Sequence, residues 1–410
     1  MKILIYGINF SPELTGIGKY TGEMAEWLAG QGHEVRVITA PPYYPEWSIG
    51  KKYVNFYSCN KSKNITIIRC PLYVPSKPTA VKRLLHLASF SISSFLPVIG
   101  SAFWKPDIVI HIVPTLLCSV QTLILSKLAK AKSVVHIQDY EVDAMFDLSI
   151  AKTGFFKEIS YWLEKKILNS FQVVSTISKG MINRASQKGI KDNKLLFFPN
   201  WSEVSRFENH IKDRQFLNDL GINPEKKIVL YSGNLGEKQG LESLVYAADL
   251  MRIKSDIHFI VVGEGAVKAN IEKLAGELNL QNIQFLPLVP YRMLPKLLAS
   301  ADCHLVIQKK GVADAVLPSK LTNILAVGGN AVITASPSTT LGILCKDFPD
   351  IAVLVEPECV ESLVAGIDRA LLMPITNQIA QKYAKNFLDK DIILSRFIKE
   401  VVQITNDFKF

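Results

Sequence analysis

Short runs of apolar, often β-branched residues alternate with stretches of helical periodicity along nearly the whole chain. The first run is Lys2–Tyr6, and the stretch after it places Ile17, Tyr20 and Met24 on one helix face before Glu34–Thr39 returns as a second run. Runs this apolar, separated by helices, are typical of parallel sheets that helices cover on both faces. The alternation therefore predicts the α/β class, with doubly wound, Rossmann-like parallel sheets.

The alternation pauses once, in a polar stretch that runs from Pro199-Asn200 to about Lys227. At 410 residues the chain is too long for one typical domain, so the pause indicates a linker between two domains. We place the first domain at residues 1–202 and the second at 203–387. The predicted strands of the first are Lys2–Tyr6, Glu34–Thr39, Ile65–Arg69, Asp107–Ile112, Ser133–Ile137, Gln172–Thr176 and Leu195–Phe198, and those of the second are Ile228–Ser232, His258–Val262, Ile283–Leu286, His304–Ile307, Ala331–Thr334 and Ala352–Val355.

The charge of the chain favours anionic partners. The formal net charge is +10, which suits nucleotides or a membrane surface. The basic residues are spread out, however, with no long Lys/Arg block and no basic motif interleaved with aromatic residues. We therefore expect no nucleic-acid partner.

The cysteines and the amino terminus indicate the compartment. The six cysteines form no CxxC pair and no metal-ligand spacing, which fits a reducing compartment and predicts no metal site. The first residues, MKILIYGINF, are too short for a signal peptide and indicate a buried first strand. We therefore expect a cytoplasmic protein.

Residues 84–104 indicate contact with a membrane as well. They contain no Asp, Glu, Lys or Arg and are long enough to span a bilayer. Pro97, Gly100 and several serines lower the hydrophobicity, and a span would separate strands that belong to one sheet. We favour a half-buried helix whose basic edge, at Lys82-Arg83, touches anionic lipid, and a membrane span stays as the alternative.

The stretch VLPSKLTNILAVGGNAVIT, residues 316–334, carries the strongest signal for a binding site. In open α/β sheets, ligands bind beyond the carboxyl ends of the strands, near helix starts. A helix that starts at Ser319-Lys320 offers free backbone N–H groups and a cation, which suit a phosphate. Glycine-bearing loops at 232–240, which includes Lys238, and at 263–265 follow two other predicted strands of this domain. Their convergence predicts a nucleotide-diphosphate site, whereas each alone would be an ordinary turn or helix start.

In the first domain the same rule selects three segments. Asn9–Lys19 is a glycine-bearing loop that matches neither a Walker loop nor GxGxxG. His111 stands at a strand end, where a histidine is either catalytic or structural. Asp139, Glu141 and Asp143 crowd three carboxylates into a short stretch that either holds sugar hydroxyls or is a solvated loop. No Gly-x-Ser-x-Gly elbow, HExxH or catalytic cysteine constellation occurs, so hydrolase and metalloprotease functions lack support.

These segments give the chain a family likeness. It resembles the retaining glycosyltransferases of family 4, which have the GT-B architecture of two Rossmann-like domains facing across a cleft. The resemblance covers essentially the whole chain and rests on Gly16-Ile17-Gly18-Lys19, Pro199-Asn200, Tyr231–Gly236, Val261–Gly265 and Pro318–Leu321. Residues 11–45 and 317–334 are more narrowly similar to the colanic-acid-type exopolysaccharide glycosyltransferases, often described as fucosyltransferases.

The resemblance implies a division of labour between the domains. The second domain would bind the donor, the first the acceptor, and residues 388–410 would pack back onto the first. It implies no cofactor and no essential metal, so that lysines and helix N-termini neutralise the leaving diphosphate, and it implies a front-face displacement with retention. It assigns donor binding to Gly16, Gly18, Lys19, Gly233, Asn234, Lys238, Gln239, Gly263, Glu264, Ser319, Lys320, Leu321 and Asn323, and catalysis to Asp139, His111 and Lys320.

Several positions depart from the family's pattern. Asn234 stands where many members have a phosphate-binding arginine, and Gln239 stands where a lysine is expected, with Lys238 one place early. Asn323 replaces the glutamate that usually holds the donor ribose; it can still hydrogen-bond a hydroxyl but carries no charge. The other departures are Gln138, where the family has a histidine before Asp139, and Asp314 or Ala315 near the place of the first glutamate.

Together these observations predict a cytoplasmic glycosyltransferase at the inner face of the cytoplasmic membrane. We expect it to move a sugar, fucose by the narrower resemblance, from a GDP- or UDP-linked donor to a lipid-linked saccharide in exopolysaccharide synthesis. A GT-B nucleotide-sugar epimerase stays open as an alternative. So does a non-catalytic, nucleotide-sugar-binding subunit of a polysaccharide assembly, because of Asn234 and Asn323. A two-lobed solute-binding protein fits less well, because no signal peptide is seen.

Overall fold

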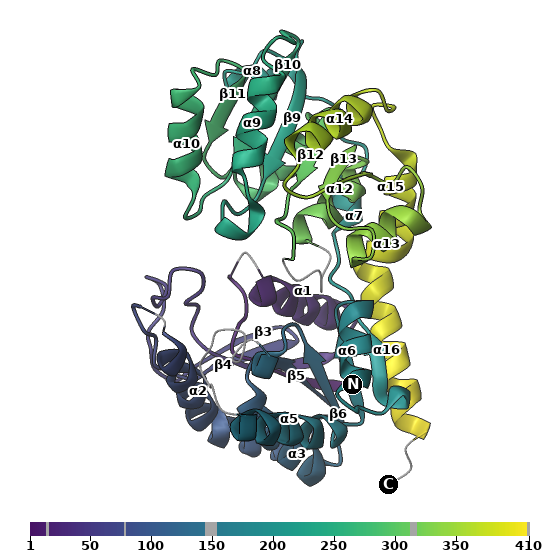
Figure 1. Ribbon diagram of the computed structural model, residues 1–410. Helices are drawn as coiled ribbons and strands as arrows, with labels where there is room; N and C mark the ends of the chain where they lie inside the picture. Colours follow the sequence, from purple (N-terminus) through teal and green to yellow (C-terminus); the bar gives the residue numbers. More distant parts are fainter. Residues whose placement is uncertain (14–15, 78, 144–153, 312–317, 408–410) are drawn as a thin grey trace. The chain divides into compact units, whose positions relative to one another are not determined.

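The computed structural model describes the chain except residues 14–15, 78, 144–153, 312–317 and 408–410, and it divides into two compact units (Figure 1). Unit 1 contains Met1–Pro199 and Leu394–Phe410, and unit 2 contains Asn200–Ile393. Each unit is built on a largely parallel sheet with helices packed against it. The predicted α/β class with two parallel-sheet domains is therefore confirmed.

Unit 1 has an eight-stranded sheet with the order β3-β4-β2-β1-β5-β6-β7-β8. Its described strand pairs are parallel except β3 with β4, which is antiparallel. Strand β3 was not predicted, because this edge strand, SCNKS, is polar and mostly exposed and so shows no apolar run. The strands are β1 Lys2–Tyr6, β2 Glu34–Thr39, β3 Ser58–Ser62, β4 Ile65–Arg69, β5 Ile108–Val113, β6 Lys132–Ile137, β7 Val173–Thr176 and β8 Leu195–Phe197.

Helices cover both faces of this sheet. Leu4 and Tyr6 of β1 share a core with Phe90, Cys118 and Leu125 from two of the helices, because alternate strand residues point to the same face. Figure 1 shows the sheet between α1 on one side and α2, α3 and α5 on the other. The helices are α1 Gly16–Gly30, α2 Ala80–Gly100, α3 Leu116–Ala129, α5 Gly154–Asn169, α6 Lys179–Gln187 and α16 Lys390–Asp407, the last joining unit 1 from Leu394, with short 3₁₀ turns at Ser101–Trp104 and Asp192–Lys194.

Helix α2 is the segment for which the sequence left two interpretations. Val81–Trp104 is long and apolar enough to cross a membrane by length and composition, yet 33% of its most apolar window is buried inside the protein. Phe90 and Val98 lie in the core of unit 1, and the Ser94 hydroxyl hydrogen-bonds the Tyr6 hydroxyl at 2.6 Å. One side of α2 is therefore buried in unit 1, as expected for the half-buried helix.

Unit 2 has a six-stranded sheet with the order β11-β10-β9-β12-β13-β14, parallel in every described pair. Ile228 and Leu230 of β9 face one hydrophobic core while Val229 and Tyr231 face the other, so this sheet too is doubly wound. The strands are β9 Lys227–Ser232, β10 Ile257–Val262, β11 Ile283–Leu286, β12 Cys303–Val306, β13 Ala331–Thr334 and β14 Val353–Val355. The helices are α7 Val204–Phe207, α8 Arg214–Asp219, α9 Glu242–Leu250, α10 Lys268–Glu277, α11 Leu294–Ala299, α12 Ser319–Val327, α13 Thr340–Asp347, α14 Val360–Leu371 and α15 Gln378–Tyr383, with 3₁₀ turns at Glu237–Gln239 and Tyr291–Met293 and a π-helical turn at Ala384–Leu388. The predicted linker thus contains α7 and α8.

Candidate functional site

The loops that follow β9 and β10 in unit 2 are bonded to each other. The Leu235 backbone N–H donates to the Glu264 carbonyl at 2.9 Å. A Cβ added to Gly263 would lie 2.0 Å from the Gly233 carbonyl oxygen, which no side chain tolerates. Gly263 is therefore needed for the contact between the loops, and the structure brings the two predicted glycine loops together.

The Lys320 side chain lies against the first of these loops. Its ammonium nitrogen is buried and has no hydrogen-bond partner in the part of the chain that the structure describes. It lies 3.8 Å from the centre of the Tyr231 ring, and a Cβ on Gly233 would lie 3.0 Å from it. Burial lowers the pKa of Lys320 to about 7. A buried cation without a partner is costly, and an anion bound beside Gly233 would relieve that cost.

Lys320 belongs to the first turn of α12, whose start is open to a ligand. Among the described residues, no side chain caps this helix at Pro318. The Leu321 N–H is already used, since it donates to the Pro318 carbonyl at 2.8 Å, and the Leu321 side chain is fully buried in the core. The predicted contribution of Leu321 to donor binding is therefore restricted to shaping the helix start. Ser319 is the first residue of α12, and its side chain lies outside the described atoms.

The other predicted residues of the β9 loop gather around Gly236. A Cβ added to Gly236 would lie 2.9 Å from the Gln239 side-chain oxygen and 3.0 Å from the Asn234 side-chain nitrogen. Asn234 and Lys238 are exposed, whereas the Gln239 oxygen is buried and has no partner among the described residues. The Lys309 backbone N–H donates to the Lys238 carbonyl at 3.0 Å, which adds a second exposed lysine that the sequence analysis had missed.

Two further predicted donor-binding residues have partners within unit 2. The side-chain oxygen of Asn323 accepts a hydrogen bond from the Ser202 hydroxyl at 2.9 Å. Glu264 forms an ion pair with Lys268, one turn along the chain, at 2.8 Å. Asp314 and Ala315, near the place of the family's first glutamate, lie outside the described residues.

In unit 1, the start of α1 is open at Gly16. This glycine has φ of 61°, and a Cβ there would meet no described atom within 4 Å. Lys19, predicted to bind the donor, instead approaches Glu23 on its own helix at 3.7 Å and lies 5.2 Å from the Tyr20 ring centre. The structure thus leaves room for a ligand at Gly16 and holds Lys19 along α1.

Gly18 has a different neighbour, the buried carboxyl of Glu13. A Cβ on Gly18 would overlap Glu13 Oε2, so glycine is needed for this carboxyl to be buried. Glu13 accepts hydrogen bonds from the Asn9 side chain at 3.0 Å and the Tyr43 backbone N–H at 3.3 Å. Burial raises the pKa of Glu13. This carboxyl joins the loops after β1 and β2. The rule about carboxyl strand ends selects its loop from the sequence but does not select Glu13.

His111 lies inside unit 1. Its ring is fully buried, with Nδ1 3.1 Å from the Tyr6 carbonyl oxygen and Nε2 3.1 Å from the Thr115 carbonyl oxygen. Burial lowers the pKa of His111 to about 4, so the imidazole is neutral near pH 7. These contacts are those of a structural histidine, and the catalytic role of His111 stays a prediction.

The acidic segment after β6 separates into different environments. Asp139 is exposed. Glu141 accepts a hydrogen bond from the Leu116 N–H at 2.7 Å, at the start of α3, and burial raises its pKa. Asp143 is buried and pairs with Arg184 at 2.8 Å. Of these three carboxylates, Asp139 is the one whose side chain the described geometry leaves at the surface.

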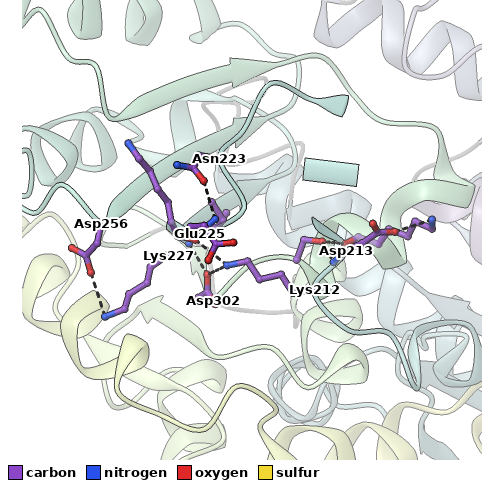
Figure 2. A network of polar contacts seen from close by, with 11 residues as sticks. Lys212, Asp213, Asn223, Glu225, Lys227, Asp256 and Asp302 are labelled. Carbon is purple, nitrogen blue, oxygen red and sulfur yellow. Dashed lines mark hydrogen bonds and ion pairs between the residues drawn. The ribbon is translucent and has the colours of Figure 1, made fainter. Parts of the chain in front are cut away.

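The opposite end of the unit 2 sheet carries charges of another kind. Figure 2 shows a network in which Lys212 pairs with Asp302 at 2.8 Å and Lys227 with Asp256 at 3.5 Å. Asp302 also accepts the backbone N–H of Ile228 at 2.7 Å. These residues lie at the amino ends of β9, β10 and β12, where no ligand is expected. Among the described residues, no group of three or more His, Cys, Asp or Glu is arranged to hold a metal ion.

Two family models match the chain, one over most of unit 1 and one within unit 2. Residues 15–201 match the glycosyl transferase 4-like domain, and residues 212–387 match the glycosyl transferases group 1. An Escherichia coli K12 protein named "Putative colanic acid biosynthesis glycosyl transferase WcaI" is 55% identical over 407 residues, which cover 98% of this chain and 100% of the relative.

Solved structures show the same fold at low identity. Sucrose-phosphate synthase from Thermosynechococcus elongatus superposes with a TM-score of 0.71 at 16% identity, covering 99% of this chain and 100% of the other. Anabaena Alr3699/HepE in complex with UDP-glucose gives 0.65 at 15% identity, covering 98% and 100%. With both family matches in place and a relative more than half identical over its full length, the chain belongs to the GT-B glycosyltransferases, with a 4-like amino-terminal domain and a group 1 carboxyl-terminal domain.

Proposed function

We propose that this glycosyltransferase moves a sugar from a nucleotide-diphosphate donor to a lipid-linked saccharide, at the inner face of the cytoplasmic membrane. The polymer is an exopolysaccharide of the colanic acid type, a proposal that the name of the E. coli relative supports. The UDP-glucose complex of a protein with the same fold supports a nucleotide sugar as the donor. Unit 2 binds the donor and unit 1 binds the acceptor in this proposal.

The observation that carries the proposal is the buried Lys320 ammonium, which has no hydrogen-bond partner among the described residues. When the glycosidic bond to the donor breaks, negative charge develops on the leaving diphosphate. Lys320 lies at the uncapped start of α12 and against Gly233, so a cation and backbone N–H groups meet at one point. In this arrangement the diphosphate supplies the partner that Lys320 lacks. We propose that these groups, with Lys238, neutralise the diphosphate without an essential metal.

The proposed chemistry retains the configuration at the anomeric carbon. The acceptor hydroxyl forms the new bond to this carbon on the face that the diphosphate leaves, and its proton passes to the departing phosphate oxygen. Lys320 stabilises the charge that remains. Of the residues predicted to be catalytic in unit 1, Asp139 stays in the proposal because its side chain is exposed, and His111 does not.

Calorimetric titration with GDP and UDP, followed by turnover of GDP-fucose and UDP-glucose with a lipid-linked acceptor, tests the proposal. We expect one nucleotide to bind, transfer to occur only with acceptor present, and the product to keep the donor's anomeric configuration by NMR. EDTA should leave the rate unchanged. Nucleotide binding without transfer would favour the non-catalytic subunit, and a donor sugar that changes without any acceptor would favour the epimerase.

A further inference from the structure

Helix α2 carries an apolar stripe on its exposed side. Val81, Leu85, Ile92, Leu96 and Phe103 are between 55% and 93% exposed. The first four are spaced four or seven residues apart, which places them along one line of α2, and Phe103 lies in the 3₁₀ turn that follows the helix. The polar residues Ser91 and Ser94 of α2 are buried instead. The helix therefore presents Val81, Leu85, Ile92 and Leu96 outward, while Phe90 and Val98 face the core of unit 1.

Two neighbouring helices repeat the pattern. Leu117, Val120, Ile124 and Leu128 of α3 are between 41% and 60% exposed, again at spacings of three or four. On α5, Ile159, Trp162 and Leu163 are between 38% and 57% exposed. Helix α3 packs against both α2 and α5, and Figure 1 shows all three on the same side of the unit 1 sheet. We call these twelve side chains of α2, the turn after it, α3 and α5 the three-helix face.

The three-helix face is bordered by cations. Residues 80–138 contain a single acidic residue, Asp107, which accepts the Lys2 N–H at 2.6 Å. The same stretch contains six Lys and Arg, among them Lys82, Arg83 and Lys130. Helix α5 adds three lysines and two glutamates, of which Glu158 is exposed and Glu164 is buried and paired with Lys188. Cations therefore outnumber carboxylates around the apolar side chains, which suits a bilayer that contains anionic lipid.

This charge pattern disfavours a second copy of the chain as the occupant. A two-fold dimer brings the same patch of both copies together, so the cations at the border would meet cations. An anionic bilayer supplies opposite charge instead. Apolar surface of this extent is also unusual on a monomer that nothing covers.

We propose that the three-helix face docks on an anionic phospholipid bilayer and lies in its interface. The inner side of α2 is fixed to unit 1, since Gln121 donates to the Ser91 carbonyl at 2.7 Å and Tyr6 bonds Ser94 at 2.6 Å. The Tyr57 hydroxyl donates to the Ser93 carbonyl of α2 at 2.8 Å and adds an exposed aromatic ring beside the stripe. This inference deepens the proposed function, on which it rests for the lipid-linked acceptor.

Vesicle co-sedimentation of the full chain tests the inference. We expect binding to phosphatidylglycerol-rich vesicles that falls with salt, and weak binding to pure phosphatidylcholine vesicles. Ile92→Glu combined with Leu96→Glu should lower the vesicle partition constant at least about tenfold, because two inserted side chains become charged. The matched control is Ile253→Glu with Leu372→Glu, two positions of unit 2 that are 84% and 85% exposed, and it should bind as the native chain does.

Calorimetry with a nucleoside diphosphate keeps the two proposals apart, since it reports on unit 2 and should be unchanged in both double variants. Vesicle binding without transfer activity would support membrane docking by the three-helix face and contradict the proposed function. Absence of vesicle binding by the native chain, or equal binding of the two double variants, would overturn the inference. A dimer that the Ile92→Glu and Leu96→Glu chain loses in analytical ultracentrifugation would assign the face to a second copy instead.

Discussion

The lysines at the two ends of the unit 2 sheet differ in their hydrogen-bond partners. At the amino end, Lys212 is paired with Asp302, which also accepts the Ile228 N–H, and Figure 2 shows further pairs around them. At the carboxyl end, the Lys320 ammonium is buried over the Tyr231 ring and has no hydrogen-bond partner in the described residues. Charges at the amino end are paired within the fold, whereas the charge at the carboxyl end is not paired within the described residues. This difference is why we propose a stabilising role for the first group and diphosphate binding for Lys320.

The largest effect should come from Lys320→Met, which keeps the length of the side chain and removes its charge. Loss of leaving-group stabilisation should lower kcat by about 100- to 1,000-fold, as for other groups that stabilise developing charge. The ligand-free variant should be at least as stable as the native chain at pH 7, because no buried cation remains. Steady-state kinetics measures the change in kcat, and thermal unfolding measures the change in stability. An unchanged kcat would show that Lys320 has no part in the mechanism.

Asp302→Ala should give the opposite result. It leaves the Ile228 N–H without its acceptor and Lys212 with only the Lys226 carbonyl, and we expect a loss of about 1–3 kcal/mol in the free energy of unfolding. The activity of the molecules that stay folded should be within about twofold of the native value, since this network lies away from the carboxyl end of the sheet. Denaturant unfolding measures the stability change. A drop in kcat comparable to that of Lys320→Met would break the comparison.

The burial of Lys320 also predicts how the free energy of unfolding depends on pH. The pKa of Lys320 is about 7 when folded and near 10.5 when unfolded, so between these values the unfolded chain binds more protons. The free energy of unfolding should therefore rise with pH across this window, by up to about 1.4 kcal/mol per pH unit from this group. The difference between the native chain and Lys320→Met isolates its contribution. Parallel stability curves for the two proteins from pH 7 to pH 10 would contradict the buried, unpartnered state.

The smallest effect concerns Asn323, whose side-chain oxygen accepts a hydrogen bond from the Ser202 hydroxyl. The Ser202 backbone is itself bonded to Leu388 and Lys390, so this contact ties α12 to the segment before α16. Asn323→Ala and Ser202→Ala should each cost about 0.5–1.5 kcal/mol of stability, and the double variant should cost little more than either one. If Asn323 holds the donor ribose instead, Asn323→Ala alone would weaken nucleotide binding. A double-mutant cycle with calorimetry on all four proteins decides between them.

Most of the fold followed from the apolar runs. Buried parallel strands such as β5 and β10 are apolar except for one histidine each, so their position was readable from the sequence alone. Strand β3 was not readable, because it is an edge strand whose side chains are mostly exposed. The short helices α7 and α8 were taken for linker, since each is too brief to show a period.

The site was readable in part. The rule about carboxyl strand ends found Lys320 and the glycine loops, because it depends only on where strands stop. It did not find Tyr231, whose ring lies under the ammonium, or Lys309, because both contacts join residues far apart in the chain. Nor does a glycine in a sequence reveal its neighbour. Gly263 permits a close approach of two loops, and Gly18 permits a buried carboxyl.

The central claim is that a bound diphosphate becomes the partner of Lys320. Calorimetric titration of the preferred nucleoside diphosphate at pH 8, in two buffers of different ionisation enthalpy, measures the protons taken up on binding. With a pKa of about 7 the free Lys320 is mostly neutral at that pH, and the diphosphate should recharge it, so the native chain should take up close to one proton. Lys320→Met should take up almost none and bind more weakly. Equal proton uptake and equal affinity in the two proteins would contradict the claim.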